Sequence, residues 1–361
     1  MSARNDQIMN LLSGLVDPHT GLNLVAAKQV KKIETQGDTV IIRLVLGYPA
    51  AGYHDELTAR VVEQLNTEGA AGPVRVEIET SIVAHSVQKN LKPMPGIRNI
   101  IAVASGKGGV GKSTTAVNLA LALHADGARV GLLDADIYGP SQPLMLGITG
   151  RPDNDGKTMS PMMAHGLQSM SIGYLVEEDT PMIWRGPMVT SALQQLLKET
   201  RWDNLDYLII DMPPGTGDIQ LTMAQQIPVS GAVIVTTPQD IALLDARRGL
   251  NMFEKVNIKV LGIIENMSQH VCSQCGHMEP IFGTGGGQRM AEQSGVPLLG
   301  ALPLDIGIRL NADGGNPSVI ADPGGTVARS YFHIARSLAA RLAQTPKDYS
   351  HRFPNISVLN R

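Results

Sequence analysis

From about residue 99 onward, short apolar runs alternate with stretches whose apolar residues recur at helical spacing. The apolar runs predict strands at residues 100–104, 130–134, 207–211, 232–236, 260–265 and 298–302. Parallel strands that are buried on both faces have such near-continuous apolar sequences, with amphipathic helices between them. We therefore predict an α/β fold in which helices cover both faces of a mostly parallel sheet. Residues 151–173, which are richer in Gly, Pro and Met, are expected to form an insertion, and the amphipathic run 327–342 is expected to pack against the sheet.

The first 88 residues have a different pattern, which predicts a small α+β domain. A helical stretch at 8–15 precedes two alternating strands at 39–46 and 74–80, with a helix at about 55–66 between them. Residues 89–98 contain two prolines, one glycine and three basic residues, and this composition is typical of a linker. We therefore expect an accessory domain over 1–88, a linker over 89–98 and the larger α/β domain over 99–361.

Composition and charge narrow the class of protein. Hydrophobic residues make up 43% of the 361 residues, and 30 Lys and Arg residues nearly balance 33 Asp and Glu residues, so the charge balance implies no broad basic face for nucleic acid. No run approaches 18 apolar residues, and the first ten residues have no apolar signal core. We expect a cytoplasmic protein with neither nucleic acid nor a membrane as its partner.

A glycine-rich segment joins the first of the predicted strands to the first predicted helix. Residues 106–113 read G-K-G-G-V-G-K-S, directly after an apolar run and before the helical pattern at 115–124. Glycines let several backbone N–H groups approach phosphate oxygens, and the helix adds the positive end of its dipole. This context predicts a P loop in which Lys112 contacts the β- and γ-phosphates and the Ser113 hydroxyl binds Mg²⁺. The predicted nucleotide-binding residues of the loop are Gly106, Lys107, Gly108, Gly109, Val110, Gly111, Lys112, Ser113 and Thr114.

Aspartates follow two of the other predicted strands. Asp211 ends one apolar run, and the segment 132–141 (L-L-D-A-D-I-Y-G-P-S) supplies Asp134 and Asp136. We expect Asp211 to hold Mg²⁺, Asp134 to support the metal, and Asp136 to orient or deprotonate the attacking water. Together with Lys107 and Lys112 of the loop, Asp136 and Asp211 are the candidate catalytic residues. The loop after Asp211 is expected to act as a switch, with the Gly215 N–H approaching the γ-phosphate.

The only two cysteines, Cys272 and Cys275, are spaced C-x-x-C within the segment H-V-C-S-Q-C-G-H at 270–277. Two thiolates do not complete a four-coordinate metal site. Three interpretations therefore stay open: a zinc site completed by His270 and His277, a redox dithiol, or a cluster shared by two chains about a two-fold axis.

The run K-G-G-V-G-K-S-T resembles the deviant P-loop ATPases. In that family the first lysine, here Lys107, reaches the nucleotide of the other subunit across a dimer interface. An asparagine after a later strand, here Asn266 in E-N-M-S, binds the purine, and the resemblance favours ATP.

The full motif set, which also includes D-A-D-I-Y-G-P-S, D-M-P-P-G-T-G-D, T-T-P-Q-D and C-S-Q-C-G-H, is similar to the Mrp/ApbC group of iron–sulfur cluster carrier ATPases. The N-terminal region resembles the small domain of iron–sulfur assembly proteins, with Asp17-Pro18-His19 where that domain has an acidic signature. The resemblance implies a homodimer that binds ATP and Mg²⁺, carries a labile 4Fe-4S cluster on Cys272 and Cys275 of both subunits, and transfers it to apoproteins.

Two other functions use the same P loop. A MinD/ParA-like positioning ATPase would need an anchor or a basic face, and it would leave the cysteines without a role. An ATP-driven electron donor would also bridge a cluster across a dimer, but its cysteines lie far apart in sequence.

Overall fold

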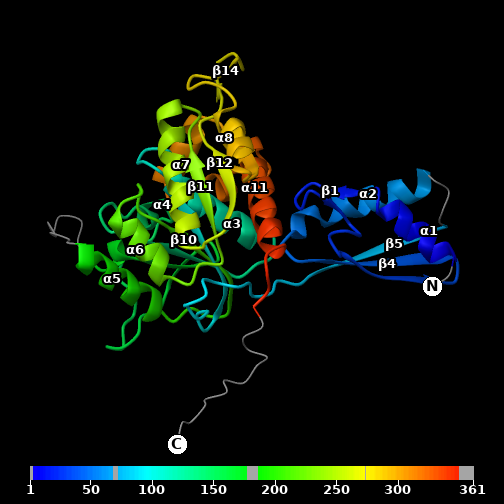
Figure 1. Cartoon of the computed structure of the whole chain (residues 1–361), viewed down its shortest axis with the longest axis horizontal. Coiled ribbons are helices and arrows are strands. Elements are labelled where there is room, and N and C mark those ends of the chain that lie inside the picture. The colour runs from blue at the N-terminus through cyan, green and yellow to red at the C-terminus, as the bar shows by residue number, and fades with distance from the viewer. Residues whose placement is uncertain (1–2, 68–71, 177–185, 273, 349–361) are drawn as a thin grey trace, which may run out of the picture.

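The computed structural model describes residues 3–67, 72–176, 186–272 and 274–348. Its centre is one eight-stranded sheet with helices on both faces, and a small N-terminal domain lies beside it (Figure 1). This is the α/β arrangement predicted from the sequence. None of the helices in the described ranges is long and apolar enough to span a bilayer.

The sheet has the strand order β15-β12-β11-β6-β10-β7-β9-β8, and all neighbouring strands are parallel except β8 and β9. All six strands predicted from apolar runs belong to it. Its strands are β6 (Ile97–Ala104), β7 (Val130–Asp134), β8 (Met162–Ala164), β9 (Leu167–Ser171), β10 (Leu205–Asp211), β11 (Gly231–Thr236), β12 (Val260–Glu265) and β15 (Leu298–Ala301).

Two hydrophobic cores cover the two faces of this sheet, because alternate residues of each strand point to opposite sides. On β10, for example, Tyr207 and Ile209 face one core, and Leu208 and Ile210 face the other. Helices α3 (Lys112–Ala125), α10 (Ser318–Ala321) and α11 (Thr326–Ala343) contribute to the first core, and α5 (Gly186–Lys198), α6 (Asp218–Gln226), α7 (Asp240–Lys255) and α8 (Gly286–Ser294) to the second. The packing of α11 against α3 and β15 confirms the prediction for residues 327–342.

The remaining elements of this domain are short. They are α4 (Gln142–Met145), η2 (Ile172–Tyr174), the antiparallel pair β13 (His270–Val271) and β14 (Met278–Glu279), and α9 (Ile306–Asp313). The β13–β14 hairpin projects from one end of the domain, at the top of Figure 1.

The prediction that residues 151–173 form an insertion was wrong. Strand β9 pairs in parallel with β7 and extends the main sheet, and β8 follows it as the edge strand. The segment lacks an apolar run because two of its buried residues are serines. The Ser169 hydroxyl bonds the Tyr174 hydroxyl at 2.9 Å, and the Ser171 hydroxyl donates to Asp134 at 3.1 Å.

The N-terminal domain has a three-stranded sheet covered by two helices. Strand β4 (Thr39–Leu46) lies between β3 (Val30–Gln36), which is antiparallel to it, and β5 (Val74–Thr80), which is parallel. Buried Leu57, Val61 and Leu65 recur every four residues on α2 (His54–Thr67), so one face of that helix packs on the sheet. The other elements are α1 (Ala3–Leu12), β1 (Val16–Asp17), β2 (Leu22–Asn23) and η1 (Ala51–Tyr53). The predicted helix at 8–15 is thus shifted toward the N-terminus, and β3 was not predicted.

The N-terminal domain contacts the larger domain through α11 and the end of α3 (Figure 1). Arg336 of α11, which is half-buried, forms an ion pair of 2.6 Å with buried Asp126, the residue that follows α3. The backbone N–H groups of Ala51 and Gly52 also donate to Asp126, at 3.2 and 2.9 Å. The segment between the domains is held as well, because Gln88 donates to the carbonyls of Ala224 and Ile227. Strand β6 begins at Ile97, inside the range expected to be a linker.

Candidate nucleotide site and cysteine hairpin

The P loop connects β6 to α3, and its glycines have identifiable structural reasons. Gly109 and Gly111 both have φ of +79°, a left-handed conformation that L side chains rarely adopt. At Gly106 a Cβ atom would lie 2.1 Å from the carbonyl carbon of Asp245, so the loop packs directly on the backbone of α7. At Gly111 a Cβ would lie 2.2 Å from Asn266 Nδ2. The loop is therefore fixed from two sides.

Lys112, Ser113 and Asp211 lie together at the start of α3. Lys112 Nζ forms an ion pair with Asp211 Oδ1 and lies 3.0 Å from Ser113 Oγ. Both charged side chains are buried. The second Asp211 oxygen accepts a hydrogen bond of 2.9 Å from Gln142 Nε2. The start of α3 therefore brings together a positive charge that can bind phosphate and oxygen atoms of the kind that bind Mg²⁺.

Asp134 lies beside Asp211, because the parallel register of β7 and β10 pairs the two residues. Its carboxylate accepts four hydrogen bonds from the chain that follows and from β9. The donors are Asp136 N (3.1 Å), Ser141 N (3.0 Å), Gln142 N (3.1 Å) and Ser171 Oγ (3.1 Å). Burial, and then the charge of Asp211, raise the pKa of Asp134 to about 7. Asp134 therefore organises the loop between β7 and α4, and its support of a metal stays a prediction.

A cavity of about 620 Å³ opens next to these groups. Half-buried Asp136 lies on its wall, and burial raises the pKa of this carboxyl group. Of the residues predicted to bind nucleotide, those that line the cavity are Lys107, Gly108, Gly109, Gly111, Lys112, Ser113, Thr114 and Asn266. The lining does not include Gly106, Val110, Asp134 or Asp211. Residues 303–305 and α9 complete it.

Asn266 connects the cavity to the P loop. Its Nδ2 donates to the Val110 carbonyl at 2.9 Å, and its Oδ1 accepts from Met267 N at 2.9 Å. Purine recognition by Asn266 stays a prediction, since both polar ends of the side chain have partners within the chain.

The Gly215 N–H, which was expected to approach the γ-phosphate, instead donates to the Ser105 carbonyl at 3.0 Å. The loop after β10 is therefore bonded to the base of the P loop.

The cysteine hairpin is built on the wall of the same cavity. The chain leaves β12 through Asn266, and Ser268 N then donates to Leu302 O at 2.9 Å. Leu304 N donates to Gln269 O at 2.8 Å, and a ring nitrogen of His270 lies 3.1 Å from Leu304 O. The strand β13 thus starts on the segment that borders the nucleotide cavity.

The two cysteines occupy the turn of this hairpin. Cys272 N donates to His277 O at 2.9 Å, and Gly276 N donates back to Cys272 O at 2.8 Å. Both thiols are free, Cys272 half-buried and Cys275 exposed. The backbone N–H groups of Gln274 and Cys275, followed by the Cys275 side chain, lower the pKa of Cys272, which favours the thiolate that binds metal.

The described residues do not assemble a site of three or more His, Cys, Asp or Glu ligands around the two cysteines of one chain. Among them, no group of three or more His, Cys, Asp and Glu side chains could hold a metal ion. The zinc interpretation that used His270 and His277 therefore lacks its assembled ligand set, and two thiols need ligands from elsewhere.

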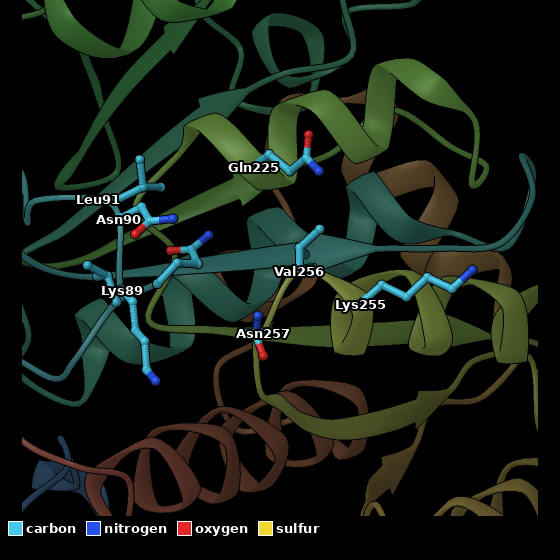
Figure 2. A pocket seen from close by; sticks show the side chains of 9 residues that line it. Lys89, Asn90, Leu91, Gln225, Lys255, Val256 and Asn257 are labelled. Atoms are coloured by element: carbon cyan, nitrogen blue, oxygen red, sulfur yellow. The ribbon is translucent and has the colours of Figure 1, made fainter.

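A second cavity of about 640 Å³ lies away from the P loop, between residues 87–91, Gln225 of α6 and the end of α7 (Figure 2). Figure 2 shows that its two lysines, Lys89 and Lys255, point away from each other. Its two cationic groups therefore do not converge on a common point.

The parallel sheet, the P loop at the end of β6 and the aspartates at the ends of β7 and β10 define a P-loop NTPase. The family model described as NUBPL iron-transfer P-loop NTPase matches residues 96–339, and a second model, described as iron-sulfur cluster assembly protein, matches residues 5–79. The chain belongs to the NUBPL iron-transfer P-loop NTPase family. The resemblance to iron–sulfur carrier ATPases noted in the sequence is thereby confirmed.

Individual relatives agree with this assignment. The chain is 50% identical to the iron-sulfur cluster carrier protein of Haemophilus influenzae over 94% of its own length and 92% of the relative's. It is 51% identical to the protein of the same name from Escherichia coli, over 93% and 91% of the two chains. Among solved structures, it is similar to a nucleotide-binding protein from Archaeoglobus fulgidus in complex with ADP, with a TM-score of 0.57, 34% identity and coverage of 66% and 91% of the two chains.

Proposed function

We propose that this protein is an ATP-hydrolysing iron–sulfur cluster carrier of the cytoplasm. Two copies bind ATP and Mg²⁺ and hold a labile 4Fe-4S cluster on Cys272 and Cys275 of both chains. The dimer then transfers the cluster, which is its cargo, to apoproteins. The observation that carries this proposal is that the cysteine hairpin stands on the wall of the nucleotide cavity.

The groups around the cavity support nucleotide and Mg²⁺ binding. Lys112 would contact the β- and γ-phosphates once they compete with Asp211 for its charge, and Ser113 and Asp211 would hold Mg²⁺. Two buried oxygen atoms next to them, Ser141 Oγ and Gln142 Oε1, have no hydrogen-bond partner among the described residues. Buried oxygens without donors fit a hydrated Mg²⁺ ion, which supplies charge neutralisation for the phosphates. Asp136 would orient the attacking water.

The cysteine hairpin supports a shared cluster. Each chain supplies two thiols on an exposed turn, and a two-fold axis through that turn would bring four together. Apolar side chains are exposed on the hairpin and around the cavity, as expected for a surface that a second copy covers. They are Tyr138, Leu144, Val271, Met278, Ile281, Ile306 and Leu310. In such a dimer Lys107, half-buried on the cavity wall, would reach the partner's phosphates.

The connection between the two sites supports coupling of nucleotide to cargo. Asn266 bonds the P loop, and only five residues separate it from Cys272. A nucleotide that moves the P loop would therefore move the base of the hairpin. ATP changes the hold on the cluster only if it binds one arrangement of the dimer more tightly than the other.

The test is anaerobic reconstitution followed by transfer. Wild-type protein is expected to gain iron and sulfide in a dimer and to activate an apo-enzyme that needs a 4Fe-4S cluster, at a rate that changes with ATP. Cys272→Ser and Cys275→Ser should lose bound iron and keep nucleotide binding. Lys112→Ala should lose nucleotide binding, and Lys107→Ala should keep binding but lose hydrolysis.

His277→Asn is the matched control, because it alters the same turn without removing a thiol. It should retain iron and sulfide. The carrier proposal would be refuted if the wild-type protein bound stoichiometric zinc without sulfide and His277→Asn lost that zinc. A protein that stays monomeric with both ATP and reconstituted iron would refute it as well.

A further inference from the structure

Gln142, which no motif in the sequence singled out, joins three parts of the nucleotide site. Its side chain is completely buried, and its Nε2 donates to the Ser113 carbonyl at 3.1 Å and to Asp211 Oδ2 at 2.9 Å. Its backbone N–H donates to Asp134 Oδ2 at 3.1 Å. One residue thus bonds the P-loop helix and the aspartates at the ends of β7 and β10.

The orientation of this amide follows from its partners. Both atoms that Nε2 contacts, Ser113 O and Asp211 Oδ2, are hydrogen-bond acceptors. Rotating the amide by half a turn would place Oε1 against two oxygens, one of them charged, so the NH₂ group must face them. Oε1 therefore points elsewhere, and it is a buried acceptor with no partner among the described residues.

Gln142 and Lys112 hold opposite oxygens of the Asp211 carboxylate. Lys112 is the group that phosphates attract, so its bond to Asp211 weakens when a nucleotide binds. The bond from Gln142 is made by a neutral amide, which phosphates do not draw away. Gln142 is therefore the contact that can keep the Asp211 carboxylate in place when Lys112 turns to the nucleotide.

We infer that Gln142 is a positioning residue that holds Asp211 in the orientation needed for the magnesium nucleotide, with its free Oε1 as the acceptor for a metal-bound water. The inference rests on the proposed nucleotide function and adds to it one residue and its role. Mg²⁺ keeps several of its waters when proteins bind it, and each such water is a strong donor. A bound water of this kind would satisfy the acceptor that the protein leaves unpaired.

The alternative is that Gln142 only stabilises the fold by bonding the Ser113 carbonyl. The chain offers a matched control for that reading in Gln88, another buried glutamine. Its Nε2 likewise donates two hydrogen bonds, in this case to the carbonyls of Ala224 and Ile227, and its Oε1 accepts from Val229 N. Gln88→Met makes the same chemical change as Gln142→Met at a position away from the nucleotide cavity.

The experiment measures the affinity of the full-length protein for a fluorescent ATP analogue, with EDTA and with Mg²⁺, together with thermal stability. For Gln142→Met we expect the affinity for the ATP analogue in EDTA to stay within about twofold of wild type. Its affinity in the presence of Mg²⁺ should fall about tenfold or more, the size expected for losing a hydrogen bond to a charged group. Gln88→Met should lose comparable thermal stability and keep the wild-type ratio of the two affinities. Gln142→Ser, which adds no bulk and cannot reach Asp211, provides the same test if the methionine variant does not fold.

A folded Gln142 variant with the wild-type ratio of affinities would overturn the inference, and so would an equal loss of affinity in EDTA and in Mg²⁺. The same shift in Gln88→Met would overturn it too, since the effect would then be one of general stability. Wild-type protein that binds no magnesium nucleotide would instead refute the proposed function itself, so the two failures are distinct.

Discussion

The packing of Gly106 on helix α7 predicts that a single methyl group at this position damages the nucleotide site. A Cβ at residue 106 would lie 2.1 Å from the carbonyl carbon of Asp245 and 2.3 Å from its oxygen. Ordinary contacts begin near 3.4 Å, so the P loop and α7 would have to separate by about 1.3 Å, the difference between 3.4 and 2.1 Å, to restore one. Both clashing groups are backbone, and neither can move by rotating a side chain. Overpacking of this kind costs about 1–3 kcal/mol, which corresponds to roughly a 5- to 150-fold loss of nucleotide affinity if the P loop moves.

Gly324→Ala is the control for Gly106→Ala. Gly324 does not line the nucleotide cavity, neither glycine has a positive φ, and a Cβ at Gly324 would meet nothing within 4 Å. Calorimetric titration with ADP measures both variants without requiring hydrolysis. We expect Gly106→Ala to bind in the predicted range of weakened affinity and Gly324→Ala to bind within about threefold of wild type. Equal affinities in the two variants would refute the argument that α7 holds the P loop in its binding conformation.

Two further predictions concern the contact between the domains. Arg336→Ala leaves Asp126 buried without its ion pair, and should lower the free energy of unfolding in urea by about 3–5 kcal/mol. The control Arg329→Ala removes an exposed charge from the same helix and should change this free energy by less than about 0.5 kcal/mol. Similar losses in both variants would contradict the role of the ion pair. Burial, helped by the charges of His333 and Arg336 and opposed by Asp17, lowers the pKa of His19 to about 4, below its ordinary value of 6.5. The unfolded chain therefore binds the proton first, so this contribution to stability is complete above pH 6.5 and is lost as the pH falls toward 4, by roughly 3 kcal/mol. Urea unfolding of wild type and His19→Gln between pH 7 and 4 measures it, and identical pH slopes would contradict it.

The sequence predicts a strand correctly where burial alone requires its residues to be apolar. Five of the six predicted strands are buried on both faces, so their sequences contain almost only apolar residues; the sixth, β15, lies at the edge of the sheet and is only partly buried. Strand β9 was missed because hydrogen bonds, not apolar contacts, satisfy its buried Ser169 and Ser171. Strand β3 was missed because its sequence, VKKIETQ, is mostly polar and none of its residues is fully buried. Neither kind of strand has the apolar pattern that predicts a strand from sequence.

The site was predictable where the chemistry is local in sequence. The P loop carries its glycines, lysine and serine in consecutive positions, and Asp134 and Asp211 each directly end an apolar run. Gln142 gave no signal, because its partners Ser113 and Asp211 lie 29 and 69 residues away. The closing of the Gly215 loop onto Ser105 could not be predicted either, since it depends on how β6 and β10 are placed side by side.

Helix α3 suggests how the N-terminal domain can sense the nucleotide site without touching it. The helix begins at Lys112 in the P loop, and the residue after its end, Asp126, accepts bonds from Gly52 and Arg336 at the domain contact. Ten of its fourteen residues are buried, so it has little room to bend and should move as one body. Because a shift at one end of a rigid helix must appear at the other, a movement of the P loop would reach the ion pair at Asp126 and the domain contact beside it. If α3 couples the two sites, Arg336→Ala should change how nucleotide affects the docking of the N-terminal domain and leave the affinity for ADP nearly unchanged. Equal changes in docking and in ADP affinity would show only a loss of stability.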